Sequence, residues 1–212
     1  MAQVTEQDAK QNDDDDATMN MDEDQDEDDQ KESPDVQPKR QPNLLITGTP
    51  GVGKTSLIEA LCEETELTSI DVNELVKTHK FHEGKDPDRD CLIVDEDKLM
   101  DYIEDSIIET TNGGNVFDTH MAGGFDPKWF DLVIVLRCDN TILYDRLEER
   151  GYVQKKIQEN VEAEIMQVVY DEAMETFDKK IVIQLQNDDI DQQEDNITKI
   201  KQWMAQFDKS NK

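Results

Sequence analysis

The sequence contains few cysteines and no long apolar run. Its three cysteines, Cys62, Cys91 and Cys138, are far apart and have no paired spacing, so they indicate neither a disulfide framework nor a zinc site. No segment approaches the roughly 20 consecutive apolar residues that a membrane-spanning helix needs. The first residues are acidic where a secretory or mitochondrial leader would be basic. We therefore expect a protein of the cytosol or the nucleus that contacts no membrane.

Positive charge is scarce as well. The 212 residues carry 22 Lys and Arg against 52 Asp and Glu, which gives a formal net charge of -30. Residues 1–42 hold fifteen of the acidic residues and almost no large apolar side chain. They cannot bury enough surface to offset the entropy of ordering, so we predict an acidic disordered tail over 1–42 and one folded domain over 43–212.

The excess of acidic residues limits the partners of both parts. Because an acidic surface repels phosphodiester backbones, we expect no sequence-specific binding of nucleic acid. The tail suits two roles that composition does not separate. It is either a solubilising segment or a docking segment for a basic partner, such as a ribosomal protein or a histone.

Short apolar runs alternate with helical patterns through the predicted domain. The runs lack polar alternation and predict strands buried on both faces; they are 43–48, 67–71, 114–120, 131–138 and 180–186. Apolar residues at helical spacing predict helices between them; these cover 54–64, 95–111, 139–150, 155–178 and 190–208. Strands that alternate with helices predict an α/β fold, with a parallel sheet covered on both faces.

The stretch GTPGVGKT, residues 48–55, matches the pattern G-x-x-x-x-G-K-[ST] between a predicted strand and a predicted helix. Its glycines allow backbone N–H groups to approach phosphate oxygens closely. Lys54 can reach the β- and γ-phosphates, and the hydroxyl of Thr55 can bind magnesium. The stretch therefore predicts binding of a nucleoside triphosphate with Mg2+.

The signatures of a GTPase are missing. A D-x-x-G motif would need a glycine at position 121, which is Met121, and no N-K-x-D follows the fourth predicted strand. Both absences argue against a GTPase and favour ATP.

Two further groups of residues suit a phosphate site. Asp118 ends a predicted strand, at the edge where parallel sheets bind ligands, and can bind Mg2+ or its water. His120 can orient a water or take a proton. The alternative for this pair is an aspartate that caps a turn and an ordinary surface histidine.

Arg146 and Arg150 are four residues apart, so they share one face of a predicted helix. Arginine binds phosphate oxygens in a bidentate manner and stacks on bases, which suits a lid over ATP. Ion pairs at the surface with Asp145 or Glu149 are the alternative.

Several long segments resemble one family in the right order. They are NLLITGTPGVGKTS, DCLIVDED, NVFDTH, WFDLVIVLR and LYDRLEERGYVQKKIQENVEAEI. Together they resemble the adenylate kinase isoenzyme 6 family, also called coilin-interacting nuclear ATPase proteins, over essentially all of 43–207. The resemblance implies a three-layer phosphate-loop kinase fold with a five-stranded parallel sheet. It also implies a monophosphate-binding segment near 70–96 and a short lid near 149–159.

The resemblance further implies site residues. Gly51, Gly53, Lys54, Thr55 and Ser56 match the ATP-phosphate loop. Asp118 and His120 match the atypical D-x-H motif of the family, and Arg150 matches the arginine of its lid.

The chain departs from the family pattern at three places. Thr119 stands where an aromatic residue is usual, and residues 186–189 differ near the expected adenine site. Lys77 replaces an arginine of the monophosphate site, so a point charge stands there instead of a bidentate fork.

By the same resemblance, the protein transfers the γ-phosphate of ATP to AMP or another nucleoside monophosphate and also hydrolyses ATP. The family acts in the nucleus and the cytoplasm, in maturation of the small ribosomal subunit, with the ribosomal protein uS11 as partner. Our first hypothesis is therefore a monomeric adenylate kinase with additional ATPase activity. The second is an ATP-switched assembly factor whose kinase activity is incidental. Lys54, Thr55 and Asp118 argue against a third, a binding module without turnover.

Overall fold

The computed structural model describes residues 40–86 and 91–210, with side chains placed for 40–86 and 92–207. The predicted acidic tail lies outside the described residues as far as residue 39. In the described residues, no helix is long and apolar enough to cross a membrane.

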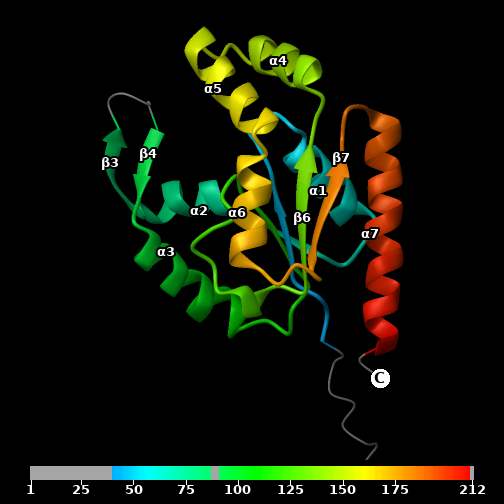
Figure 1. Ribbon diagram of the computed structural model, residues 1–212. Coiled ribbons are helices and arrows are strands. Elements are labelled where there is room, and N and C mark those ends of the chain that lie inside the picture. The colour runs from blue at the N-terminus through cyan, green and yellow to red at the C-terminus, as the bar shows by residue number, and fades with distance from the viewer. Residues whose placement is uncertain (1–39, 87–90, 211–212) are drawn as a thin grey trace, which may run out of the picture. The chain divides into compact units, whose positions relative to one another are not determined.

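A five-stranded sheet forms the centre of the domain (Figure 1), and its strand order is β2-β5-β1-β6-β7. All four neighbouring pairs are parallel. Each predicted strand contains one of the five observed strands, which are β1 (Leu44–Thr47), β2 (Thr68–Asp71), β5 (Asn115–Asp118), β6 (Leu132–Arg137) and β7 (Val182–Gln186). The prediction of an α/β fold with a five-stranded parallel sheet is confirmed.

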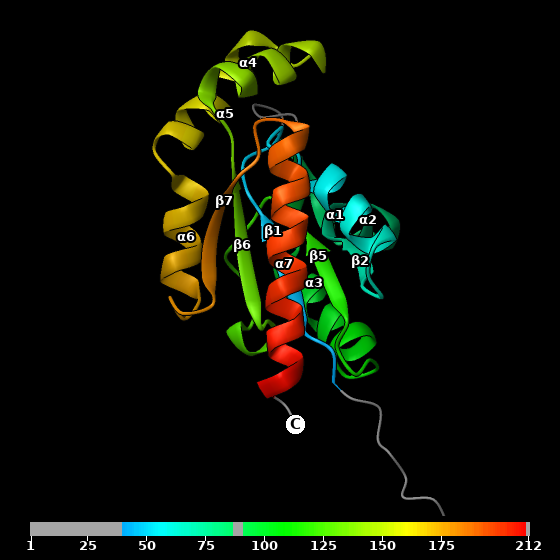
Figure 2. The same ribbon diagram turned by 90° about the vertical axis from the view of Figure 1, so that its right-hand side faces the viewer.

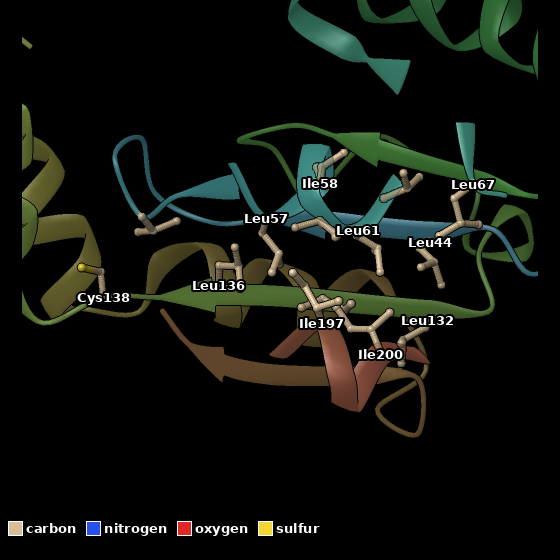
Figure 3. Close-up of a cluster of buried hydrophobic side chains, with 14 of the residues drawn as sticks. Leu44, Leu57, Ile58, Leu61, Leu67, Leu132, Leu136, Cys138, Ile197 and Ile200 are labelled. Carbon is tan, nitrogen blue, oxygen red and sulfur yellow. The ribbon is translucent and has the colours of Figure 1, made fainter. Parts of the chain in front are cut away.

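Helices cover both faces of this sheet (Figure 2), because its central strands carry apolar side chains on both faces. Leu44 and Ile46 of β1 pack into the cluster of buried side chains in Figure 3, with α1 (Lys54–Glu63) and α7 (Ile190–Ser210). Leu45 points to the opposite face, into a second cluster. The helices that pack there are α2 (Val72–His79), α3 (Glu96–Ile103) and α6 (Val168–Thr176).

The prediction of one helix over 155–178 is wrong. The segment forms α5 (Gln154–Ile165) and α6, and Gln167 between them has a left-handed backbone with φ 57°. Ile157 of α5 packs into the first cluster and Ala173 of α6 into the second. A single straight helix could not reach both faces of the sheet, so the chain turns at Gln167.

The predicted helix over 95–111 also ends differently. Its first part is α3, and residues Glu104–Ile108 continue as a short π-helix. The other predicted helices are observed with boundaries shifted by one or two residues; they are α1, α4 (Asn140–Glu149) and α7.

Three elements of the segment 70–96 were not predicted from the apolar pattern. Helix α2 follows β2 directly, and β3 (His82–Asp86) pairs with β4 (Cys91–Val94) in an antiparallel hairpin outside the main sheet. The strand β3, with the sequence HEGKD, has no apolar run that could have indicated it.

Ordered contacts begin slightly before the predicted domain boundary at residue 43. The guanidinium of Arg40 donates two hydrogen bonds of 2.9 Å to the carboxylate of Asp131. The backbone N–H of Gln41 donates to Asn112 O at 3.0 Å. Residues 40–42 are therefore attached to the amino-terminal edge of the sheet.

Candidate functional site

A cleft of about 910 Å3 lies at the carboxyl edge of the sheet, where β1 and β5 end. Its walls come from the loop 48–53, α1, the ends of β2 and β5, α2, the segment that joins α4 to α5, and α5 itself. All of the site residues predicted from the sequence line this cleft: Gly51, Gly53, Lys54, Thr55, Ser56, Lys77, Asp118, His120 and Arg150. The structure thus brings together residues from distant parts of the sequence, and their roles remain predictions.

Two glycines of the phosphate loop have conformations that favour glycine. Gly51 and Gly53 have φ 100° and φ 97°. A Cβ at Gly51 would lie 2.8 Å from Leu143 Cδ1, and one at Gly53 would lie 2.5 Å from Asn187 Nδ2. The Asn187 amide in turn donates to Val52 O at 3.0 Å. The loop is therefore packed closely against α4 and the end of β7, and its backbone stays accessible from the cleft.

Lys54 begins α1 and is only 9% exposed. Its ammonium donates to Gly48 O at 2.7 Å and to Thr49 O at 3.2 Å, so it lies over the loop. Burial lowers the pKa of Lys54 to about 8; Arg150 adds to the shift, and Asp118 opposes it. A buried cation with few counter-charges favours the binding of an anion beside it.

Thr55 and Asp118 form the polar floor of the cleft. The hydroxyl of Thr55 donates to Asp118 Oδ2 at 2.7 Å. Burial raises the pKa of the Asp118 carboxyl, and the hydrogen bond from Thr55 opposes that shift. Hydroxyl and carboxylate oxygens are ligands that Mg2+ prefers, and Mg2+ commonly takes only one or two protein ligands beside phosphate and water. These two residues therefore fit the predicted ion.

The structure shows no larger ligand set at this place. Within 40–86 and 91–210, no group of three or more His, Cys, Asp or Glu is arranged to hold a metal ion. Any Mg2+ in the cleft would thus depend on phosphate oxygens and water for most of its ligands.

His120 projects into the cleft two residues after Asp118 and is exposed. The walls of the cleft lower the pKa of His120 by partial desolvation, and the charge of Lys54 adds to this shift while Asp118 opposes it. A neutral imidazole at pH 7 can accept a proton or a hydrogen bond from water. Thr119 between the two residues is buried, so the unusual residue of this motif points away from the cleft.

Arg146 of α4 and Arg150, which directly follows α4, have different surroundings. Arg150 lines the cleft. The guanidinium of Arg146 donates instead to Asn187 O at 3.1 Å and to Asp188 O at 2.5 Å. Both arginines line a smaller neighbouring pocket of about 350 Å3. Arg146 therefore fixes the loop after β7, and only Arg150 is placed as the sequence analysis expects of a lid arginine.

Lys77 lies on α2 and lines the same cleft, with 63% of its side chain exposed. Its ammonium is 4.0 Å from the carboxylate of Glu74, one turn away. A weak exposed pair of this kind leaves the ammonium able to bind another anion.

Glu164 of α5 was not among the site residues predicted from the sequence. It is 2% exposed, and its carboxylate accepts hydrogen bonds from Thr49 Oγ1 and Arg137 Nε, both at 2.5 Å, and from Cys138 N at 3.2 Å. Glu164 thus ties the phosphate loop and the end of β6 to α5. A signal was present, because Glu164 falls on the apolar stripe of Ile157.

Comparisons with known proteins agree with this geometry. A family model described as AAA domain matches residues 44–167. The chain is similar to the adenylate kinase isoenzyme 6 homolog of Schizosaccharomyces pombe, at 46% identity over 169 residues, 80% of this chain and 95% of the relative. The homolog of Dictyostelium discoideum is 44% identical over 173 residues, 82% of this chain and 97% of the relative.

A solved structure shows the same fold. A gluconokinase from Sinorhizobium meliloti 1021 matches 81% of this chain and 96% of its own, with a TM-score of 0.50 and 13% sequence identity. At this identity the match shows the fold alone.

Replacing Glu164 by Ala should lower the free energy of unfolding by about 3–5 kcal/mol, because it leaves the Arg137 charge unpaired and partly buried. Denaturant unfolding followed by circular dichroism measures the change. Glu162→Ala, at an exposed position of the same helix, should change stability by no more than about 0.5 kcal/mol. Equal effects of the two substitutions would show that the Glu164 contacts contribute little.

Proposed function

The chain belongs to the adenylate kinase isoenzyme 6 family, and we propose that it transfers the γ-phosphate of ATP to AMP or a related nucleoside monophosphate. The observation that carries the proposal is the placement of Lys54 and Arg150 beside the phosphate loop, with Lys77 in the same cleft. Lys54 and Arg150 suit the phosphates of a donor, and Lys77 suits the phosphate of an acceptor. The names of the relatives support AMP as that acceptor.

On the donor side, the chain would act by position and charge. Backbone N–H groups of the loop and the amino end of α1 bind phosphate oxygens, since glycines leave that backbone accessible. The Lys54 ammonium lies over the loop and would neutralise charge that develops on the β- and γ-oxygens. Arg150 would bind the same oxygens from the segment between α4 and α5. No covalent intermediate is needed, because positioning and electrostatic stabilisation account for most phosphoryl-transfer catalysis.

Thr55 and Asp118 would hold Mg2+ with ATP in the cleft. The ion, if bound there, would supply positive charge that offsets part of the negative charge of the phosphates. The hydrogen bond between Thr55 and Asp118 already holds their two oxygen atoms 2.7 Å apart at the cleft.

The γ-phosphate could be transferred to an acceptor, which Lys77 would bind, or to water, which His120 would orient. Lys77 would bind the phosphate of the acceptor, with the segment 70–96 as its binding segment and 149–159 as a lid. A monophosphate brings its own nucleophilic oxygen, so it needs no base. His120 would instead orient a water and give the protein its additional ATPase activity.

A second function is favoured by the acidity of the chain, which has 52 Asp and Glu against 22 Lys and Arg. We propose that an ATP-dependent change of this protein alters its affinity for a basic partner, the small-subunit ribosomal protein uS11, during maturation of the small ribosomal subunit. Such a coupling is reciprocal, so the partner would also change the affinity for ATP. The protein would act as a monomer in the nucleus and the cytoplasm.

An acceptor screen tests the first function. Purified protein with ATP and Mg2+ is assayed for ADP formation without acceptor and with AMP, GMP, CMP or UMP. We expect at least one monophosphate, with AMP the first candidate, to accelerate ADP formation several-fold. No acceleration by any monophosphate would reject the kinase.

His120→Ala separates the two activities in the same assay. We expect hydrolysis without acceptor to fall about 10²-fold or more, because an aligned water is lost. Transfer to AMP should stay within twofold. Loss of transfer with unchanged hydrolysis would contradict the role given to His120. If AMP has no effect but uS11 changes the rate of hydrolysis, the second function is supported instead.

The lowered pKa of Lys54 predicts that the proton uptake on ATP binding depends on pH. With a pKa of about 8, this ammonium is half charged at pH 8 in the free protein. Bound triphosphate favours the charged form, so ATP binding at pH 8 should take up roughly half a proton. At pH 6.5 Lys54 is already charged, so ATP binding should cause no proton uptake by Lys54.

Titration calorimetry in buffers of different ionisation enthalpy measures this proton. Lys54→Arg is the matched control, because arginine stays charged throughout. Equal proton uptake by the two proteins at pH 8 would contradict the assignment to Lys54.

A further inference from the structure

The loop that carries His120 is held at several points after β5. The hydroxyl of Thr47, at the end of β1, donates to Met121 O at 3.1 Å. The backbone N–H of Met121 donates to the Thr119 hydroxyl, also at 3.1 Å. These contacts fix the two residues on either side of His120 relative to the sheet.

A third attachment comes from Glu172 on α6, far away in the sequence. Its carboxylate accepts a hydrogen bond from Gly123 N at 3.0 Å and a longer one from Ala122 N at 3.4 Å. Ala122 itself is completely buried in the second core cluster. Glu172 therefore joins the loop of His120 to the helix that covers this face of the sheet.

The chemistry of this contact is specific to a carboxylate next to a glycine. Two neighbouring N–H groups converge on one side chain, and an ionised carboxylate is the acceptor that can serve both. A glutamine would present an NH2 group to one of them and leave that donor unpaired. A Cβ at Gly123 would lie 2.7 Å from Glu172 Oε1, so a larger residue there would require the carboxylate to shift.

We propose that Glu172 is a positioning residue that sets the rate of ATP hydrolysis by holding the His120 loop in place. It does not line the cleft, in contrast to His120. The inference rests on the proposed function, because it assigns hydrolysis to His120. It goes beyond that function because the ratio of ATP hydrolysis to phosphate transfer would then depend on α6, a helix that does not line the cleft.

Glu164, in the same part of the chain as Glu172, also attaches its helix to a loop of the cleft. Glu164, eight residues earlier, accepts a hydrogen bond from the hydroxyl of Thr49 in the phosphate loop. The two carboxylates thus attach the arm α5–α6 to two different loops of the cleft. Loss of the Glu164 contact should disturb ATP binding and both activities, whereas loss of the Glu172 contact should disturb hydrolysis alone.

Kinetics of Glu172→Gln test the proposal. We expect kcat for ATP hydrolysis without acceptor to fall at least tenfold, with KM for ATP and the rate of transfer to AMP within twofold of the wild type. Glu175→Gln, at an exposed position one turn further along α6, is the matched control and should leave every rate unchanged. A parallel loss of hydrolysis and transfer, or unchanged hydrolysis, would overturn the proposal.

A double substitution shows whether Glu172 acts through His120. In a His120→Ala background, Glu172→Gln should slow hydrolysis by less than twofold more. Effects that multiply would overturn the proposal, since Glu172 would then act independently of His120. This double-mutant cycle measures only the rate of ATP hydrolysis. It therefore decides the role of Glu172 even if the acceptor screen rejects the proposed kinase activity.

Gly123→Ala provides a second way to break the same contact. It should reproduce the loss of hydrolysis, with transfer again within twofold, and the pair Gly123→Ala with Glu172→Gln should be no slower than the slower single variant. If thermal denaturation shows that Glu172→Gln is unfolded, Gly123→Ala alone decides. Full hydrolysis by a folded Gly123→Ala protein would then overturn the proposal.

Discussion

Glu164 is a buried acid whose carboxylate binds the phosphate loop at Thr49, the end of β6 at Cys138 and the guanidinium of Arg137. Removing two charges from water is costly, and only close contacts with further hydrogen bonds offset that cost. Here the carboxylate has three partners, and Arg137 also donates to Glu164 O at 2.8 Å. The arrangement stabilises one position of α5 relative to the loop. The residues of α5 that line the cleft, Lys156, Glu159 and Asn160, depend on that position.

The two sides of the cleft differ: the side of the phosphate loop is held by hydrogen bonds, and the side of α2 is exposed to solvent. Lys54, Thr55 and Asp118 are fixed by hydrogen bonds to the loop and to each other. Lys77 stands on α2 with most of its side chain in solvent. Phosphoryl transfer needs a donor held rigidly and an acceptor brought to it, which agrees with this difference. In the proposed function, the contact of Glu172 with Gly123 would add a separate control over hydrolysis, because it acts on the loop of His120 and not on the donor phosphates.

The sequence was sufficient for those features that depend on local pattern. The three central strands, β5, β1 and β6, are apolar runs buried on both faces, and the glycines of the phosphate loop indicate its conformation directly. The edge strands β2 and β7 are partly exposed, so the prediction of burial on both faces is wrong for them. Asp118 and His120 could be placed at the correct edge because a parallel sheet brings the carboxyl ends of its strands together. Contacts between distant segments could not be read in this way. The turn at Gln167 arises because α5 and α6 pack on opposite faces, and Glu164 and Glu172 find their partners only after that turn.

The central claim is that the phosphate loop, through Lys54, holds the triphosphate of ATP. The most direct measurement is equilibrium binding of ATP with Mg2+ to the wild type and to Lys54→Met, with thermal denaturation to show that both are folded. We predict at least a tenfold weaker affinity for the variant, which corresponds to about 1.4 kcal/mol. Equal affinity of the two folded proteins would contradict it.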